Sequence, residues 1–468
     1  MAAEVAPEVC AGPMPADAPQ VPVAIVGAGA CGLTSALMLA GRSRECVVLE
    51  RDAAPAGSTA LSSGFIPAAG TTAQRAQGIE DSAERFAADI QAKARGTAAP
   101  HLVEAYARAI APALDALAGG HGLQFEVLEG FLYPGHTRPR MHAVPERTGA
   151  GLMQRLRRAA DAAEVPVITQ ARVTQLWMQD GAAVGLGFVR PDGTTEHLRC
   201  DVLVLACNGF GGNRELVREL LPEMADATFG GHAGNDGSAI AWGRALAARL
   251  ADLGGYQGHG SWAEAQGILI SWALMTEGGI QVNAQGRRFH DETQGYSEAA
   301  VQVLAQPGGI AWDVFDTPLL QFAQQFPDFV EARAAGAVRT AANVADLAAM
   351  IGCDPAVLQA TLDGVRPGAV ADDGRRFARA LAPPYHAVKV TGALFHTQGG
   401  LDIDAHCRVL RQDGSPWPNL LAAGGAARGV SGNAVWGYLS GNGLLSAVAG
   451  GAISAATAAQ LLSAKEST

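Results

Sequence analysis

Charged side chains are scarce in this chain of 468 residues, where they make up 17% of the sequence. The few that exist are mostly acidic: 34 Lys and Arg stand against 45 Asp and Glu, which gives a formal net charge of −11. No run of basic residues is present. Proteins that bind nucleic acid or an anionic membrane surface normally carry a basic patch. We therefore expect neither partner.

Metal-binding cysteine patterns are also missing. None of the seven cysteines belongs to a CxxC, CxxCH or ferredoxin-like cluster, which argues against iron–sulfur clusters and c-type haem, and we expect no metal site. An odd, scattered set of cysteines is typical of a reducing compartment, so we expect a cytoplasmic protein. The set is Cys10, Cys31, Cys46, Cys200, Cys207, Cys353 and Cys407.

The chain lacks a recognisable secretion signal. Residues 1–20 have neither a basic start nor an apolar core, and their Ala, Pro and acidic composition predicts a disordered tail. The most apolar stretch, 442–462, has the length of a membrane span, but Gly, Ala, Ser and Thr dominate it. We expect a tightly packed internal helix there and no transmembrane segment.

The abundant residues are apolar, at 49%, and glycine, at 58 residues, which is typical of a large core with many tight turns. Residues 21–52 have the pattern strand, glycine turn, helix, strand. Residues 165–210 predict antiparallel strands joined by Asp-Gly turns, followed by a buried strand. Residues 238–385 mix helices and loops, and strand and turn signals return in 386–468. We predict an α/β protein in which a discontinuous nucleotide-binding domain, 21–237 plus 386–468, carries an inserted α+β domain, 238–385.

A dinucleotide-binding motif supports this division. Gly27-Ala28-Gly29-Ala30-Cys31-Gly32 fits G-x-G-x-x-G between a strand and a helix. Gly27 permits the tight turn, Gly29 lets the backbone approach a pyrophosphate, and Gly32 lets the helix pack on the strand. The helix start supplies amides and a partial positive charge. Glu50 ends the next strand, at the position that binds a ribose hydroxyl, so we predict a Rossmann-like unit.

The cofactor that this unit binds is better predicted as FAD than as NAD. A hydroxyl-rich loop at 51–65 suits an extended cofactor whose ring lies far from its first phosphate. Two further glycine-rich turns, "LVLACNGFGGN" at 203–213 and "LLAAGGAARGVSG" at 420–432, follow apolar strands. Three such segments converging from distant parts of the chain indicate a long groove.

The pieces "VGAGACGLTSALMLA", "ACNGFGGN", "IQVNAQGRRFHDE", "HTQGGLDIDAHCRVL" and "LLAAGGAARGVSG" occur in that order along nearly the whole chain. Together they resemble the FAD-dependent family that contains fumarate reductase flavoproteins, tricarballylate dehydrogenase and 3-ketosteroid dehydrogenases. The resemblance implies an FAD domain with an inserted capping or catalytic domain, and redox chemistry on a C–C bond beside an activating group. The FAD-binding residues predicted from motif and resemblance are Gly27, Gly29, Ala30, Cys31, Gly32, Glu50, Arg51, Ser58, Thr59, Ser62, Ser63, Gly64, Val173, Ala206, Asn208, Gly209, Asn235, Asp236, Gly424, Gly425, Asn442, Leu444 and Leu445.

The loop from Ser58 to Gly64 contains no histidine of the kind that links flavin covalently in the succinate dehydrogenase branch. We therefore expect non-covalent FAD. The family often has an acidic residue after "AAG" that reaches the ribityl chain of the flavin. Gly424 and Gly425 stand there, so that contact is predicted to be absent or to come from the backbone.

The resemblance also suggests catalytic residues. In the fumarate reductase branch, one arginine four residues after the Glu of "RF-N-E" donates the proton, and another in the last glycine segment clamps a carboxylate. Tyr296 and Tyr438 stand at those places, which disfavours a dicarboxylate. In the ketosteroid branch, tyrosines there are the base and the ketone donor, the latter aided by a backbone amide. Gly441, Asn442 and Gly443 are the candidates for that amide.

Other polar residues leave alternatives open. Tyr296 and Tyr438 can also be tyrosines that merely pack. His396 matches a family histidine that contacts substrate, and it either binds a substrate oxygen or orders its loop. Tyr133 and His136 lie in a Pro/Gly loop that can line the pocket mouth, although we expect a surface loop.

We therefore predict a soluble FAD-dependent dehydrogenase. It desaturates the α,β bond of a cyclic ketone, ketosteroid-like or smaller and cyclohexanone-like, and passes electrons to an external acceptor. The substrate is a small molecule, a cyclic ketone or the corresponding enone. One alternative is an enoate or dicarboxylate reductase that uses His396 in place of the lost arginines. The other is a flavin protein without net redox chemistry, either an isomerase or a binding module.

Overall fold

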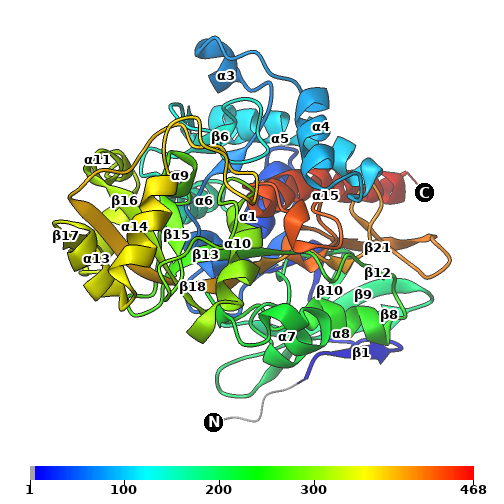
Figure 1. Ribbon diagram of the computed structural model, residues 1–468. Helices are drawn as coiled ribbons and strands as arrows, with labels where there is room; N and C mark the ends of the chain where they lie inside the picture. Colours follow the sequence, from blue (N-terminus) through cyan, green and yellow to red (C-terminus); the bar gives the residue numbers. More distant parts are fainter. Residues whose placement is uncertain (1–5, 468) are drawn as a thin grey trace.

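A computed structural model describes residues 6–467, which form two sheets surrounded by helices (Figure 1). The larger sheet has nine strands, and its centre is parallel: β21 (Pro416–Ala422), β10 (Thr195–Leu205), β2 (Gln20–Val26) and β3 (Val47–Leu49). Its remaining strands are β1 (Glu8–Ala11), β7 (Val167–Ile168), β8 (Arg172–Gln179), β9 (Ala182–Val189) and β20 (Arg408–Leu410).

The register of the parallel strands places the candidate site. Leu205 pairs with Val26 and with Ala422, and Val26 pairs with Leu49, so all four strands end at one level. In open α/β sheets, ligands bind outside the carboxyl ends of the strands. The antiparallel strands β8, β9 and β10 confirm the predicted meander.

Helices from distant parts of the chain cover this sheet. α1 (Ala30–Ala40) packs against α15 (Asn442–Glu466) so closely that a Cβ on Gly451 would lie 2.5 Å from the Cys31 carbonyl oxygen. α15 is long and apolar enough to span a membrane, but 56% of its most apolar 18-residue stretch is buried inside the protein. The other helices between β3 and β13 in sequence are α2 (Gly57–Ala60), α3 (Thr72–Ala76), α4 (Ala83–Lys93), α5 (Pro100–His121), α6 (Gly149–Ala162), α7 (Arg214–Leu220) and α8 (Ser238–Ala245).

The second sheet has seven strands and its own buried core, on the left in Figure 1. Its strands are β11 (Thr228–Phe229), β13 (Tyr256–Ala263), β14 (Ile268–Leu269), β15 (Ile280–Val282), β16 (Ile310–Asp316), β17 (Arg339–Ala341) and β18 (Tyr385–Thr397). Its helices are α9 (Ala273–Thr276), α10 (Tyr296–Leu304), α11 (Thr317–Ala323), α12 (Pro327–Ala334), α13 (Val344–Ile351) and α14 (Pro355–Gly364).

Two small sheets complete the fold. β12 (Leu250–Ala251) pairs with β19 (Gly400–Leu401), and β4 (Ile66–Pro67), β5 (Glu126–Val127) and β6 (Met141–Ala143) form a three-stranded sheet. The second sheet lies, in sequence, between β10 and β20, so the chain leaves the first sheet, builds the second and returns. This is the predicted discontinuous Rossmann-like domain with an inserted α+β domain.

Two predicted boundaries are wrong in detail. The second sheet runs from Thr228 to Thr397 and so exceeds 238–385, because β11 and all of β18 belong to it. α8, in contrast, buries Trp242 in the core of the first sheet. The predicted disordered tail, 1–20, contains the edge strand β1, which pairs in parallel with β8. Residues 1–5 of that tail lie outside the described residues.

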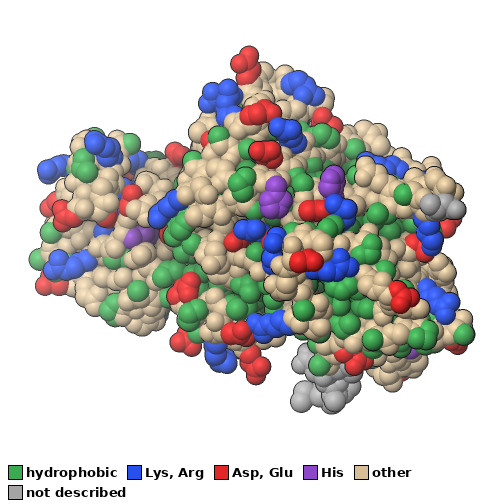
Figure 2. Space-filling view, turned by 90° about the vertical axis from the view of Figure 1, so that its right-hand side faces the viewer, with side chains coloured by type: hydrophobic (Ala, Val, Ile, Leu, Met, Phe, Trp, Pro, Cys, Tyr) green, Lys and Arg blue, Asp and Glu red, His purple; other side chains and the backbone are tan. Residues whose placement is uncertain are grey.

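The surface mixes both signs of charge. Lys and Arg lie interspersed with Asp and Glu on the face shown in Figure 2. All seven cysteines are free thiols. Within residues 6–467 no group of three or more His, Cys, Asp or Glu is arranged to hold a metal ion.

Candidate active site

The glycine turn after β2 has the shape predicted for dinucleotide binding. Gly27 adopts a φ of +103°, and a Cβ there would lie 2.6 Å from the Ala206 carbonyl oxygen. A Cβ on Gly32 would lie 1.8 Å from the Gly27 carbonyl oxygen, so the helix can pack this closely only on glycine. Above Gly29 the nearest atom is 3.7 Å away, which leaves room for a ligand to approach the backbone.

A groove lies beside the glycine turn, and Glu50, which directly follows β3, lines it. Its buried carboxylate accepts hydrogen bonds from the amides of Ala28 and Asp52, each at 2.9 Å. Eleven of the predicted FAD-binding residues line this groove. Those that line it are Gly27, Gly29, Glu50, Arg51, Ser58, Thr59, Val173, Ala206, Asn208, Asn235 and Asp236.

Residues of the segment 232–236, just before α8, also line this groove. Ser58 Oγ accepts hydrogen bonds from the Asn235 side-chain amide at 2.9 Å and from the His232 backbone amide at 3.2 Å. Arg51 donates to Asp236 at 3.1 Å. The stretch before α8 is thereby tied to the loop after β3.

A second cavity continues from the first groove, because Gly29, Ser58, Thr59, Ala206 and Asn208 line both. The predicted residues lining only this cavity are Ala30, Cys31, Ser62, Ser63, Gly64, Gly424, Gly425 and Leu444. Four predicted residues, Gly32, Gly209, Asn442 and Leu445, line neither space: Leu445 points into the main core, and Asn442 binds Ser431.

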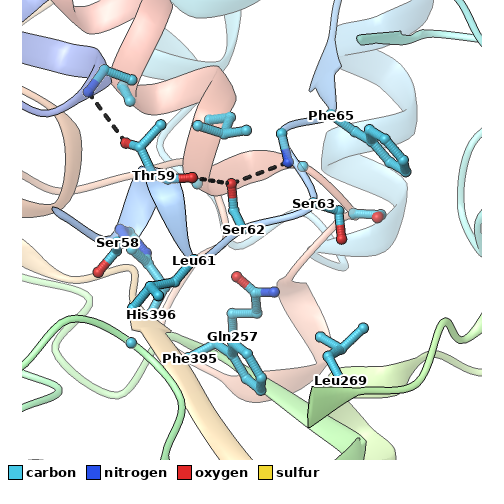
Figure 3. A pocket seen from close by; sticks show the side chains of 18 of the residues that line it. Ser58, Thr59, Leu61, Ser62, Ser63, Phe65, Gln257, Leu269, Phe395 and His396 are labelled. Carbon is cyan, nitrogen blue, oxygen red and sulfur yellow. Dashed lines mark hydrogen bonds between the residues drawn. The ribbon is translucent and has the colours of Figure 1, made fainter. Parts of the chain in front are cut away.

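The three glycine-rich segments meet at this cavity, as predicted. A Cβ on Gly424 would lie 3.2 Å from Cys31 Cβ, and one on Gly425 would lie 2.2 Å from Asn208 Oδ1. The hydroxyl-rich loop forms another wall (Figure 3): the Ala30 amide donates to Thr59 Oγ1 at 3.2 Å, and Ser62 Oγ donates to the Thr59 carbonyl at 2.7 Å. A long groove lined by amides, hydroxyls and bare glycine backbone fits FAD.

Tyr296 and Tyr438 lie together in this second cavity. Their ring centroids are 6.1 Å apart, with an edge-on angle of 61°. The Tyr296 hydroxyl donates to Ser440 Oγ at 2.9 Å. The Tyr438 oxygen accepts from the amide of Gly443, at the start of α15, at 3.4 Å. Of the three backbone amides considered from the sequence, Gly443 makes this hydrogen bond, and the Gly441 amide also lies near enough to oppose the rise in the pKa of Tyr438 that burial causes.

Neutral groups surround these phenols. Burial raises the pKa of Tyr438 to about 12, and burial together with the neighbouring Tyr438 hydroxyl raises the pKa of Tyr296 well above its usual value of 10. His259 stacks on the Tyr296 ring at 4.8 Å, and burial lowers its pKa to about 3. Tyr296 is therefore protonated in this structure.

His396 lines the same cavity in a defined tautomer. Asn442 donates to Ser431 Oγ at 2.9 Å, Ser431 donates to Gln398 Oε1 at 2.9 Å, and Gln398 Nε2 donates to His396 Nδ1 at 2.8 Å. The proton of His396 is thus on Nε2, and burial lowers the pKa of His396 to about 4. This histidine is a donor rather than a base.

Sequence reasoning missed several lining residues. Tyr133, expected on a surface loop, lines the cavity, and its ring contacts Tyr296 edge-on at 6.2 Å. His136, expected beside it on the surface, is buried. Gln257 and His259 are two residues apart on β13, and both line the cavity. The Gln257 amide points into the cavity in Figure 3. The alternation of a strand was the available signal for them.

The remaining cavity walls are mostly apolar: Phe65, Leu269, Trp272, Phe326 and Phe395. The charged side chains that line it are Arg147 and Asp328. Arg147 donates through Nε to Glu126 at 2.6 Å. Asp328 accepts from Ser63 at 3.2 Å, and burial raises its pKa.

Comparison with known proteins agrees with this geometry. Residues 22–444 match the family described as FAD binding domain. The chain is 28% identical over 448 residues, 94% of its length, to a probable fumarate reductase of Shewanella frigidimarina, of which it covers 74%. It is 27% identical over 283 residues to a 4-oxocyclohex-2-ene-1-carboxylate 5-dehydrogenase of Sinomonas cyclohexanicum, which is 50% of this chain and 47% of that relative.

Solved structures show the same fold. An open flavocytochrome c3 fumarate reductase superimposes with a TM-score of 0.80 at 26% identity, over 95% of this chain and 78% of that one. A 3-ketosteroid-Δ4-(5α)-dehydrogenase from Rhodococcus jostii superimposes with a TM-score of 0.74 at 23% identity, over 94% of this chain and 97% of that one. The chain belongs to the FAD-binding family and is an FAD-dependent oxidoreductase.

Proposed function

We propose that this FAD-dependent oxidoreductase desaturates the α,β C–C bond of a cyclic ketone. The observation that carries the proposal is the cluster of neutral hydrogen-bonding groups, Tyr296, Ser440, Tyr438 and the Gly443 amide, in the second cavity. Desaturation removes one hydride and one proton from adjacent carbons. FAD, when bound, supplies the two-electron acceptor for the hydride.

Tyr438 binds and polarises the ketone oxygen in this proposal, and the Gly443 amide supports Tyr438. The Gly443 amide donates to the Tyr438 oxygen, so the phenolic proton of Tyr438 is free to point towards a substrate. As the α-proton leaves, negative charge builds on the ketone oxygen, and the hydrogen bond from Tyr438 strengthens. His396 Nε2–H is a further donor on the same wall.

Tyr296 takes the α-proton. A free phenolate is unfavourable at this buried position, because burial raises the pKa of Tyr296. To act as a base, Tyr296 loses its phenolic proton first, through its hydrogen bond to Ser440 Oγ at 2.9 Å and on to solvent, and the resulting phenolate accepts the α-proton. The α-proton thus neutralises the phenolate, and the buried Tyr296 oxygen is uncharged after the transfer.

The charge of the cavity supports a ketone over a dicarboxylate. Two carboxylates would each need a cation or several donors. The one cavity-lining arginine, Arg147, is tied to Glu126, and the other charged side chain, Asp328, would repel an anion. The similarity to a dehydrogenase named for an oxocyclohexene carboxylate also favours a ring ketone.

A second candidate is an enoate reductase that runs the same chemistry in reverse. It is favoured by the similarity to a fumarate reductase over 94% of this chain. In this case Arg147 and His396 would bind one carboxylate, and Tyr296 would donate the proton. In either direction we propose that electrons are exchanged with an external partner and that the protein is cytoplasmic.

Anaerobic stopped-flow measurement of flavin absorbance tests the proposal. The oxidised holoenzyme is mixed with cyclohexanone, 4-oxocyclohexane-1-carboxylate, a saturated 3-ketosteroid or succinate. We expect bleaching with at least one ketone and none with succinate. The dithionite-reduced enzyme is then mixed with fumarate. Rapid reoxidation by fumarate, with no response to any ketone, would replace the first candidate by the second.

A further inference from the structure

A tight turn outside the FAD groove braces the tyrosine site. Tyr133-Pro134-Gly135-His136 has the sequence of a type II turn, with proline second and glycine third. The His136 amide donates to the Tyr133 carbonyl at 3.1 Å, and Gly135 has a φ of +91°. The turn therefore holds Tyr133 and His136 at its two ends in a fixed relation.

Both ends of this turn reach the site. Tyr133 contacts the Tyr296 ring edge-on. His136 Nε2 lies 2.9 Å from the backbone carbonyl oxygen of Ser440, the residue whose hydroxyl accepts from Tyr296. Between them, a Cβ on Gly135 would lie 2.7 Å from Leu439 Cδ1, so the turn packs on the segment that carries Ser440.

The turn is itself anchored to α4. The amide and hydroxyl of Thr137 donate to Asp89 Oδ2 at 2.9 and 2.8 Å. Arg140 forms ion pairs with Asp89 and with Asp81, the latter at 2.6 Å, and its side chain is fully buried. A side chain this well fixed loses little entropy when it holds a neighbour in place.

The bond to Ser440 defines the state of His136. A carbonyl oxygen only accepts, so Nε2 carries the proton and Nδ1 is a bare acceptor, for which the described residues offer no partner. Burial, opposed by the Ser440 bond and assisted by Arg140, lowers the pKa of His136 to about 4. Asp81 and Asp89 face the ring too, and both oppose this lowering.

We propose that the Tyr133–His136 turn is a positioning element for the Tyr296–Ser440 pair. His136 holds the Ser440 carbonyl and thereby sets the Ser440 hydroxyl at hydrogen-bonding distance from Tyr296. The catalytic consequence rests on the proposed ketone chemistry, but the positioning itself does not depend on any substrate.

Tyrosine NMR tests the positioning without a substrate. The chain has six tyrosines, so holoenzyme labelled at tyrosine Cζ gives six signals, and a Tyr296→Phe variant identifies one of them. Ser440→Ala should shift the Tyr296 signal by removing its acceptor. His136→Phe keeps a ring beside Phe86 but removes the donor, and should shift the signal in the same direction. His136→Gln retains an N–H donor and should leave the signal near its parent position.

A measurement on the unsubstituted protein tests the proposal even if a variant misfolds. In holoenzyme labelled with ¹⁵N-histidine, the His136 ring should be neutral and protonated on Nε2 throughout pH 5–8. The proposal is wrong if His136 is protonated on Nδ1, or if His136→Phe leaves the Tyr296 signal in place while Ser440→Ala moves it.

Kinetics then separate positioning from general stability. His136→Phe should slow ketone-dependent flavin reduction by up to about 10²-fold, the cost of a misplaced reacting group. In a Ser440→Ala background, it should add little, because His136 acts only through Ser440. Full additivity of the two changes would overturn the proposal. Absence of any ketone-dependent reduction would refute the proposed function alone, because the NMR result is independent of it.

Discussion

The two halves of the binding space use opposite chemistry. The groove beside β2 and β3 is built from glycine backbone, helix-start amides and charged groups such as Glu50, Arg51 and Asp236. The adjoining cavity is built from phenols, neutral imidazoles and apolar walls that both sheets contribute. A phosphate-bearing ligand gains from amides and charge at one end, whereas a neutral ketone needs polarisation without a competing ion at the other.

The difference also separates what backbone does from what side chains do. In the groove, a single added Cβ is decisive, as at Gly27, where it would lie 2.6 Å from the Ala206 carbonyl oxygen. In the cavity, the decisive atoms are hydroxyl oxygens at the ends of well-packed rings. Changes in the groove should therefore remove the cofactor or the fold, and changes in the cavity should leave a yellow, folded and slow enzyme.

The largest effect is expected from glycine substitutions in the turn. Gly32→Val places carbon against the Gly27 carbonyl and should prevent stable folding. Gly29→Val has room within the protein but fills the space open to a ligand, so it should give folded apoprotein without FAD. Circular dichroism and FAD release on denaturation distinguish the two. A yellow Gly29→Val protein would show that the pyrophosphate lies elsewhere.

Next in size is Tyr296→Phe. It keeps the ring that His259 stacks on and removes the atom that accepts the proton. Flavin reduction by the active ketone should slow by about 10²–10⁴-fold, the usual range for general base catalysis, with ketone binding little changed. Stopped-flow bleaching measures this, and FAD content is the control. A near-parent rate would make Tyr296 a packing residue.

Tyr438→Phe should cost somewhat less, about 10²–10³-fold, the typical loss for one donor to a developing oxyanion. It should also weaken binding of phenols that mimic the charged enol oxygen, which absorbance titration of the bound flavin can follow. Tyr133→Phe is the matched comparison, because it removes a third cavity phenol that lacks the Gly443 amide but keeps the ring that contacts Tyr296 edge-on. Equal losses in both variants would contradict a specific role for Tyr438.

The smallest effect concerns acid stability. His136 and His259 have pKa values lowered to about 4 and about 3, below the unfolded value of about 6.5. The unfolded chain then binds more protons in this range, so stability is lost as pH falls below about 6.5. Each histidine should account for about 2 kcal/mol between pH 7 and pH 5. The urea midpoint of His136→Gln should fall less over this range than that of the parent, at fixed FAD concentration.

Local patterns predicted the parts of this molecule that are fixed by neighbours in sequence. The Gly27–Gly32 turn, the three-stranded meander and the helix starting at Asn442 each follow from a period or a glycine spacing. The tyrosine pair was found because the resemblance to a known family marks two positions.

Features set by distant pairing were not predicted. β1 is an edge strand only because β8, over 160 residues later, offers its free side, and its Ala/Pro-rich surroundings suggested disorder. β18 belongs to the second sheet, although its last residues line the cavity that adjoins the groove of the first sheet. On α15, Leu444 faces the cavity and Leu445 the core, a difference of one helical step that sequence reasoning did not resolve.

The discontinuous FAD domain has a consequence for synthesis. β10 pairs with β21, and α1 lies against α15. The surroundings of the glycine turn near residue 30 are therefore complete only after residues 416–466 have been synthesised. At about 5–20 residues per second, a ribosome needs about 20–90 s to make the intervening chain. During that time the second sheet, whose strands all fall between Thr228 and Thr397, can fold first. Loading of the flavin is therefore a late event in the maturation of this protein, because it follows the synthesis of β21 and α15.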